Sequence, residues 1–345
     1  MSGSLFTILF VYLAKRLPTY FVENLNSTKA RFPQNDLVLV TDAIVDSRLS
    51  SSISILHPDK LDWKSSRPEL RRDMRFWDGW WQKTFDRLLM IRPVHELYPD
   101  SSLVQVEADT VLFPSFAKSS ILKQKKISYP MYSDRRAVAS LIFSSSIDNS
   151  RLLEQSLIEE LLANQGTSDM DALGSIAKKL GESFIQLPEF PHQSNNVVRE
   201  SPNDLLELGL FDGASHGEWI CGRDPKAHWG LGRRKMRTPI SENLEMPEYQ
   251  FENSQLTCRV NSLLVPIHNL HIHSKELSFF RKEDEDSVAA LISKANSANT
   301  SRRFFNFSAF IFCFQSNVKI WTSSIFSRGA WLRLISCRKS QSHIE

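Results

Sequence analysis

Two carboxylates stand close together in an apolar part of the chain. Glu107 and Asp109 follow the apolar run 103–106, a single alanine separates them, and apolar residues resume at 111. Acids in such surroundings cost free energy unless they are paired or bind a cation. In an extended chain, residues i and i+2 project to the same side. Oxygen ligands arranged in this way suit Mg²⁺ or Mn²⁺, with a substrate phosphate completing the shell.

A second group of reactive side chains follows the apolar run 263–267. His271, His273 and Lys275 alternate along the sequence, so a continuing strand would place all three on one face. Imidazoles can ligate a metal, and an ammonium group can bind an anion. The alternative is the polar outer face of an edge strand.

The segment 210–232 contains five of the twelve glycines of the chain, interspersed with acidic, basic and aromatic residues. Glycine allows the backbone to approach a ligand closely, and functional side chains are common on loops. We therefore predict a binding loop that includes Gly213 and Gly217, with Asp212 beside them.

The elements that must position these residues begin with a buried strand over 5–14, a helix over 20–32 and a second strand over 37–40. Strand, helix and strand at this spacing predict a βαβ unit and a parallel sheet. Ligands bind beyond the carboxyl ends of such strands, where Asp42 lies. An aspartate that forms a turn after the strand is the alternative for Asp42.

Two further polar residues fall on predicted helices. Arg87 lies near the end of an amphipathic helix over 75–91, where it could contact a phosphate or simply face water. Asp169 lies in the first turn of a helix that ends near residue 180, with Thr167 or Ser168 as its N-cap. An acid there also stabilises the helix dipole, so capping is the alternative to catalysis. The remaining predictions are a loop over 45–70, a strand or buried helix start over 137–143, and a helix over 150–163.

Composition narrows the protein class. The chain has 345 residues, 41% of them hydrophobic, so it can bury a core and is not globally disordered. Its net charge of +3 gives no indication of nucleic-acid binding. The four cysteines are far apart and suit neither a zinc module nor a disulfide framework, which favours a reducing compartment. The run 5–14 is too short to span a bilayer, and no basic residue precedes it.

The sequence changes character near residue 283. We expect one domain over 1–283, with a nucleotide- and metal-binding half (1–115) and an acceptor-binding half (116–283). Residues 284–345 form a C-terminal extension. Within 301–345 there are seven basic residues, one acid and seven phenylalanines. Such a tail could lie on an anionic membrane surface, or it could have no selected role.

Over residues 5–281 the chain resembles the GT-A class of nucleotide-sugar glycosyltransferases. The matching parts are the βαβ unit, the acid-x-acid motif within 106–110, the glycine-rich segment 211–217 and the late motif 269–275. The resemblance implies an α/β fold with a three-layer αβα, Rossmann-like mixed sheet. It also implies transfer of a hexosyl or similar group from a nucleotide-sugar donor to a hydroxyl of a glycan, protein or small-molecule acceptor.

The resemblance implies a role for each candidate residue. Mn²⁺ or Mg²⁺ would be held by Asp109, Glu107 and either His271 or His273. The chain departs from the class at Glu107, where aspartate is usual. The donor would be contacted by Lys275 at the diphosphate, by Asp42 at the nucleoside, and by Arg87, Gly213 and Gly217. The base that deprotonates the acceptor would be Asp169, with Asp212 as the alternative.

Two other functions stay open at this point. A nucleotidyltransferase could share the fold and the acid pair, although residues 14–18 lack the glycine-rich phosphate loop of that class. A non-catalytic binding protein could keep the fold without turnover. We expect a cytoplasmic protein, or one of the Golgi and secretory pathway if an N-terminal anchor is missing from this chain.

Overall fold

The computed structural model describes residues 6–45, 47–64, 67–69, 79–133, 135–190, 202–221, 248–260, 262–273, 275, 277–280, 286–293 and 295–296. The chain divides into two compact units, Met1–Ala295 and Asn296–Glu345. The description below concerns the first unit. The tail 301–345 and its predicted membrane contact lie outside the described residues, and the predicted roles of 1–283 and 284–345 stay predictions. Within the described part of the chain, no helix is long and apolar enough to span a bilayer.

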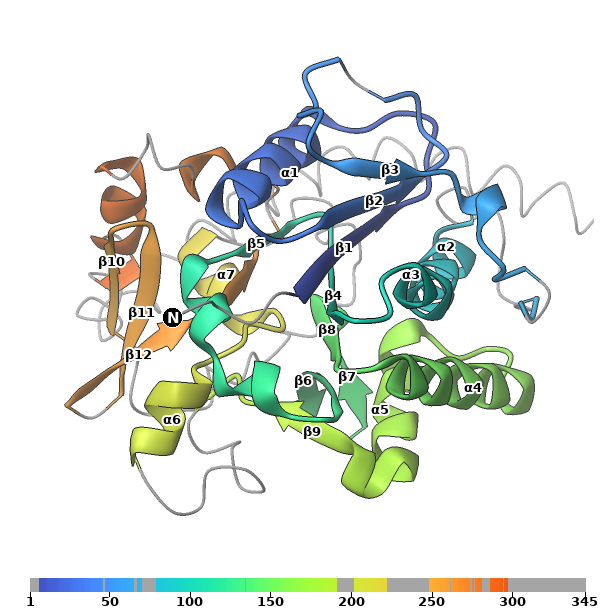
Figure 1. Cartoon of the computed structure of the whole chain (residues 1–345). Coiled ribbons are helices and arrows are strands. Elements are labelled where there is room, and N and C mark those ends of the chain that lie inside the picture. The colour runs from blue at the N-terminus through green and yellow to red at the C-terminus, as the bar shows by residue number, and fades with distance from the viewer. Residues whose placement is uncertain are drawn as a thin grey trace, which may run out of the picture. The chain divides into compact units, whose positions relative to one another are not determined.

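An eight-stranded mixed sheet forms the centre of this unit (Figure 1). Its strands follow the order β3-β2-β1-β4-β8-β6-β7, and β9 pairs with β6. The first four of these run parallel, whereas β8 is antiparallel to both β4 and β6. The strands are β1 (Phe6–Tyr12), β2 (Leu37–Thr41), β3 (Ser54–Leu56), β4 (Ser102–Val106), β6 (Ile127–Ser133), β7 (Arg136–Ala137), β8 (Leu141–Ser144) and β9 (Phe184–Leu187).

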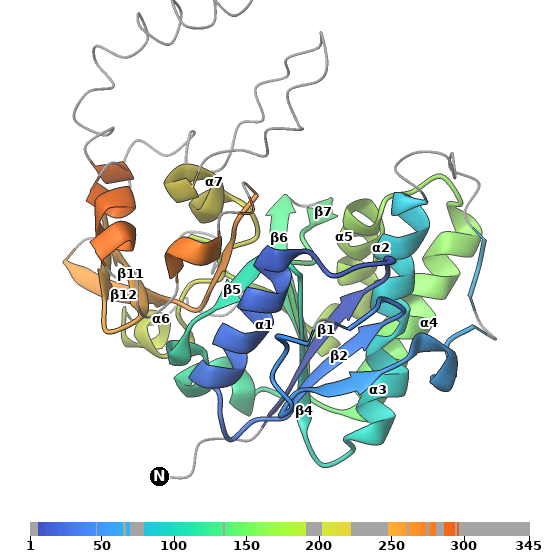
Figure 2. The same cartoon turned by 90° about the horizontal axis from the view of Figure 1, so that it is seen from above.

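Both faces of the sheet are covered, which explains why β1 is apolar at nearly every position. Phe6, Ile8 and Phe10 point into one core cluster, and Leu9 and Val11 point into another. Helix α1 (Thr19–Arg31) covers the first face, and Phe21 and Leu25 of this helix join the first cluster. Figure 2 shows α1 on one side of the strands and the later helices on the other. The structure thus confirms the predicted three-layer α/β architecture with a mixed sheet.

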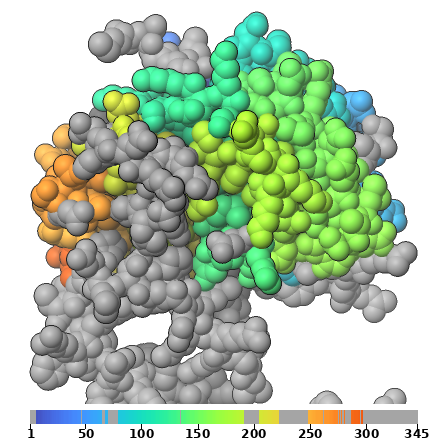
Figure 3. Space-filling model, turned by 90° about the horizontal axis from the view of Figure 1, so that it is seen from below, coloured from blue at the N-terminus to red at the C-terminus, as the bar shows by residue number. Residues whose placement is uncertain are grey.

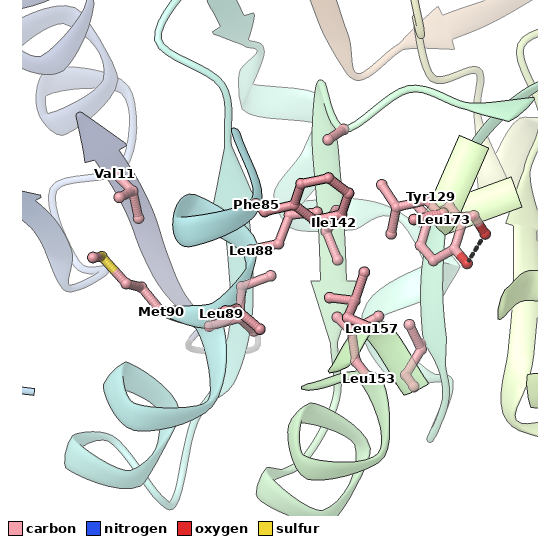
Figure 4. Packing of buried hydrophobic residues seen from close by; sticks show 14 of the residues in the cluster. Val11, Phe85, Leu88, Leu89, Met90, Tyr129, Ile142, Leu153, Leu157 and Leu173 are labelled. Carbon is pink, nitrogen blue, oxygen red and sulfur yellow. Dashed lines mark hydrogen bonds between the residues drawn. The ribbon is translucent and has the colours of Figure 1, made fainter. Parts of the chain in front are cut away.

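Four helices cover the second face: α2 (Trp80–Leu89), α3 (Ile91–Leu97), α4 (Ile147–Ala163) and α5 (Asp169–Leu180). Figure 4 shows Phe85 and Leu88 of α2 near Ile142 of β8, in the cluster that Leu157 of α4 also joins. The Tyr129 hydroxyl donates a hydrogen bond of 2.9 Å to the Leu173 carbonyl, which ties β6 to α5. The green and yellow-green part of the chain, from β6 to β9, is prominent in the view from below (Figure 3).

A smaller β layer packs around a third core cluster. It consists of a three-stranded antiparallel sheet and a separate antiparallel pair, β5 with β13. Val288 and Ile292, in the helical residues 286–293, are buried in the same cluster. The elements of this layer are β5 (Thr110–Leu112), α6 (Pro202–Leu208), α7 (Ser215–Cys221), β10 (Glu248–Glu252), β11 (Gln255–Val260), β12 (Leu263–Ile267) and β13 (Asn269–His271). Short 3₁₀ turns lie at Pro58–Lys60, Pro114–Lys118, Ser120–Lys123, Gly181–Ser183 and Leu277–Phe280.

The predicted elements differ from the structure in three places. The helix expected over 75–91 corresponds to α2 followed directly by α3, because a break occurs at Met90; its first residues lie outside the described part of the chain. The predicted loop 45–70 contains the short edge strand β3. The late strand ends at His271, so His273 and Lys275 do not continue it.

Candidate metal and donor site

The two acids lie in a turn between β4 and β5, not on an extended strand. The Thr110 N–H donates to the Glu107 carbonyl at 3.0 Å, which closes the turn. Asp109 is buried, and Glu107 is partly buried. The prediction that an extended chain brings the two carboxylates to one side is therefore wrong. The two carboxylates nevertheless lie close together, because the turn between β4 and β5 brings them there.

Strand β13 brings a histidine to these acids. It pairs with β5 so that His271 lies opposite Thr110. The Nε2 atom of His271 is 3.4 Å from Oδ1 of Asp109 and 3.6 Å from Oε2 of Glu107. One ligand atom from each of the three side chains lies within 4.8 Å of the other two. Residues far apart in the sequence thus form one acid–histidine cluster.

The other nitrogen of His271 fixes the direction of its ring. Nδ1 is 2.5 Å from the Gly213 carbonyl, which can only accept, so Nδ1 carries a proton. This leaves Nε2 facing two carboxylates. A neutral ring would present its lone pair to two carboxylate oxygens, and this arrangement requires either a proton or a cation between them. Two oxygens and an imidazole nitrogen, with the second nitrogen held by a carbonyl, form a donor set that fits a divalent metal such as Mn²⁺.

Electrostatics in the cluster couple the three side chains. Burial lowers the pKa of His271, but Asp109 and Glu107 outweigh burial and raise this pKa to about 9. Burial raises the pKa of Asp109, but His271 and Lys275 outweigh it and hold this pKa below its ordinary value. Without a metal, the histidine is therefore protonated near neutral pH and compensates the acids.

Two more cations flank the acids. The Lys275 ammonium contacts Oδ2 of Asp109. Lys275 has a φ of 64°, a left-handed conformation that is uncommon for a side chain of this size. The Arg87 guanidinium contacts Oε1 of Glu107, and its other nitrogen lies 3.6 Å from Oδ2 of Asp169. Arg87 is buried between these acids and compensates their charge. Its predicted contact with the donor stays a prediction.

His273 does not belong to the three-residue cluster. Its ring lies 4.3 Å from that of His271, and its buried Nε2 atom has no hydrogen-bond partner among the described residues. Burial and the neighbouring His271 lower its pKa to about 3, so the ring is neutral. Of the two predicted alternatives, His271 is the one placed with the acids.

Asp169 lies beside the site at the start of α5. Ser168 is the N-cap, with its hydroxyl accepting from the Asp171 N–H at 3.1 Å, so Asp169 itself is not the cap. The Asp169 carboxylate is buried next to Arg87. Burial raises its pKa, Arg87 opposes this, and Glu107 adds to it, with a net increase. A carboxylate with a raised pKa is better suited to accept a proton.

Asp212 is fully buried and bonded to backbone. Its carboxylate accepts from the N–H groups of His216 at 2.9 Å, Gly217 at 2.8 Å and His271 at 2.8 Å. Burial and the nearby Glu189 raise its pKa well above the ordinary value. The side chain therefore joins α7 to β13 and holds the backbone of His271.

The two predicted donor-binding glycines have packing roles in the structure. A Cβ atom at Gly217 would lie 1.8 Å from the His271 carbonyl oxygen, so glycine is required for α7 to pack on β13. Gly213 supplies the carbonyl that holds His271. Asp42 is exposed just after β2, at the edge of the sheet where β1 and β4 also end. Donor contacts by these residues stay predictions.

Sequence reasoning missed two residues near the cluster. Tyr12 ends β1 and packs against the same core cluster as Ala108 of the acid turn. Burial raises its pKa, Lys275 opposes this, and Asp109 adds to it, with a net increase. Asn24 of α1 donates to the Ala108 and Thr110 carbonyls. Its signal in the sequence is a polar residue on the helix face that also carries Phe21 and Leu25.

A separate open hollow of about 910 Å³ lies between the end of α5 and β9. Its lining includes Lys126, Lys178 and Phe184, and it contains none of the predicted site residues. The acid–histidine cluster, and not this hollow, carries the chemistry argued below.

No protein-family model matches the sequence, and no curated protein matches it. The structure is similar to solved glycosyltransferases. One is the PaToxG glycosyltransferase, at 9% identity and a TM-score of 0.32, over 52% of this chain and 70% of that one. A second is a glycosyltransferase involved in glycosylation of the major capsid of PBCV-1, at 9% identity and a TM-score of 0.32, over 53% and 80%. A third is the bacterial N-acetylglucosamine transferase NleB, at 10% identity and a TM-score of 0.30, over 49% and 81%. These likenesses concern the fold, and the proposal below rests on the chain's own residues.

Proposed function

We propose that this protein is a metal-dependent glycosyltransferase that uses a nucleotide-sugar donor. The observation that carries the proposal is the convergence of Glu107, Asp109 and His271 at the carboxyl end of a parallel strand, with Lys275 beside them. Ligands of α/β sheets bind at such edges. The donor set suits Mn²⁺ or Mg²⁺, and the resemblance to GT-A enzymes supports the same choice.

A bound divalent cation would act as a Lewis acid toward the donor diphosphate. In the transfer, the bond between the sugar and the diphosphate breaks, and a bond to the acceptor oxygen forms. Negative charge grows on the departing diphosphate, and we assign its neutralisation to the Lys275 ammonium, which contacts Asp109. The proton of the acceptor hydroxyl passes to a carboxylate, for which Asp169 is the better candidate because it is beside the site.

Arg87 and Asp212 act through other residues in this proposal. Arg87 forms ion pairs with the neighbouring carboxylates of Glu107 and Asp169 and holds them in place. Asp212 holds the backbone of His271, and its buried oxygens are occupied by N–H groups. We therefore assign Asp212 a positioning role and leave the proton transfer to Asp169.

The test measures release of nucleoside diphosphate. Thermal denaturation with a panel of nucleotide sugars, with and without Mn²⁺, first identifies the donor by metal-dependent stabilisation. Donor hydrolysis is then compared between wild type and Asp109→Asn. We expect at least a 100-fold loss, because the variant removes a charged metal ligand; effects of this order follow loss of a charge-stabilising group. Asp148→Asn, at an exposed surface acid, is the matched control and should retain wild-type turnover.

Equal release by wild type and Asp109→Asn would contradict the proposal. Stabilisation by a nucleotide sugar without any turnover would indicate a binding protein instead. Metal-dependent release of pyrophosphate from a nucleoside triphosphate would indicate a nucleotidyltransferase.

A further inference from the structure

The turn that holds the two acids is anchored from several directions. The Glu107 N–H donates to the Ser140 carbonyl at 3.0 Å, and the Ile272 N–H donates to the Asp109 carbonyl at 2.8 Å. These backbone bonds connect the turn to the chain before β8 and to the end of β13. Two remaining carbonyls of the turn, at positions 108 and 110, point toward α1.

Asn24 of α1 satisfies both of these carbonyls. Its Nδ2 atom lies 3.2 Å from the Ala108 oxygen and 2.9 Å from the Thr110 oxygen. A side-chain amide has two N–H hydrogens on one nitrogen, so one Asn24 can serve both acceptors. Asn24 is 3% exposed, and water cannot readily replace these bonds. Figures 1 and 2 show α1 beside β5, where the turn ends.

The two carbonyls lie on either side of Asp109. Asn24 fixes the peptide group before Asp109 and the one after Thr110, and the Ile272 N–H holds the Asp109 carbonyl between them. Together these bonds restrict the backbone of Asp109 and therefore the direction in which its carboxylate leaves the chain. We propose that Asn24 is a positioning residue for the metal site, which presets Asp109 toward His271. This inference rests on the proposed metal dependence and adds a residue from a different layer of the fold. Replacing a residue that orients a metal ligand typically weakens metal binding by about 10- to 100-fold.

Asn26 offers a matched control on the same helix. Its side chain also makes two bonds to backbone, donating to the Arg48 carbonyl at 2.9 Å and accepting from the Ser50 N–H at 2.9 Å. These bonds hold the loop after β2 and do not involve the acid turn. Replacing either asparagine by alanine removes two side-chain bonds, but the Asn24 change alone acts on Asp109.

The experiment measures Mn²⁺ binding to the full chain without donor, by electron paramagnetic resonance of the free ion, together with melting without metal. We expect Asn24→Ala to weaken Mn²⁺ binding about tenfold or more, and Asn26→Ala by less than about twofold. Asn24→Ser, which has one hydroxyl donor on a shorter side chain, should also weaken binding. It provides the test if Asn24→Ala does not fold.

Mn²⁺ affinities of Asn24→Ala and Asn24→Ser equal to wild type would overturn the inference. The same holds if Asn26→Ala weakens binding as much as they do, because the loss would then be a general effect of stability. If the wild-type protein binds no Mn²⁺, or binds it no more tightly than Asp109→Asn does, this result would contradict the proposed metal site. The inference about Asn24 would then fail together with the proposed function. The two failures are therefore distinguishable.

Discussion

At the scale of single residues, the structure shows how burial decides protonation away from the site. His268 lies between β12 and β13 and is 1% exposed. Its Nε2 donates to the Leu208 carbonyl at 2.8 Å, and its Nδ1 therefore accepts from the Ser115 hydroxyl at 2.8 Å. Both nitrogens are used by the neutral ring, so a second proton on Nδ1 would force the Ser115 hydroxyl to change from donor to acceptor. Burial lowers the pKa of His268 to about 4.

Because the pKa of His268 is lowered in the folded protein, we predict a loss of stability in mild acid. Its folded-state pKa is below the ordinary value of about 6.5, so the unfolded chain binds the extra proton more readily. The contribution of the neutral ring to the free energy of unfolding is complete above pH 6.5 and is lost as pH falls toward 4. We expect wild type to lose about 2 kcal/mol more than His268→Gln between pH 7 and pH 4.5, measured by urea unfolding. His57→Gln, at an exposed histidine, should follow wild type, and parallel curves for His268→Gln would contradict the prediction.

At the scale of elements, the contact between α7 and β13 determines where His271 stands. The contact is close because Gly217 has no side chain, and Asp212 bridges the two elements. The sequence motif around these residues was interpreted as a ligand-binding loop. Its Gly217 permits α7 to pack directly on the strand that carries the histidine, and the binding role of the segment stays a prediction.

Gly217→Ala should therefore affect both stability and metal binding. The added Cβ would meet the His271 carbonyl oxygen, so α7 and β13 must separate. We expect a loss of about 1–3 kcal/mol in the free energy of unfolding, together with weaker Mn²⁺ binding by calorimetry. Gly166→Ala is the control, since a Cβ there meets nothing within 4 Å and should be neutral. Unchanged Mn²⁺ affinity in a folded Gly217→Ala protein would show that this contact does not position the histidine.

The same scale explains what could be predicted from sequence. The βαβ unit and the helices over 150–163 and 167–180 follow from local periodicity and capping, and the acid pair is visible as two charges in an apolar run. The pairing of β5 with β13 joins segments far apart in the chain, and no local pattern encodes it. The ion pairs of Arg87 and the backbone bonds of Asp212 depend on that tertiary arrangement. Their sequence context therefore suggested contacts with a ligand.

At the scale of the whole molecule, the structure places the end of the first compact unit at Ala295. We expected a domain boundary at residue 283 because the sequence becomes highly charged there. The helical residues 286–293, however, contribute to the third core cluster. Val288 is fully buried there, and Ile292 is 4% exposed. The buried side chains at 288 and 292 thus extend the first compact unit beyond residue 283, and the predicted division of roles at 283 stays a prediction.

Two truncations test this boundary. A chain that ends after residue 296 should keep the melting temperature and Mn²⁺ affinity of the full chain, because the described contacts of the site come from residues up to Lys275. A chain that ends after residue 283 should lose about 3 kcal/mol or more, since it exposes the cluster that Val288 and Ile292 cover. Calorimetric melting of the two proteins gives the comparison. Equal melting of both would place the functional boundary at 283.

The distance along the chain between the parts of the site has a consequence for biosynthesis. Asp109 and Lys275 are 166 residues apart, and the strand with His271 must pair with β5 before the cluster exists. A growing polypeptide on the ribosome therefore carries the acid turn long before the histidine emerges. A cation that binds at this cluster, as we propose, would be captured only after nearly all of the first unit has been translated, so its uptake would mark the completion of folding and would not assist the early steps.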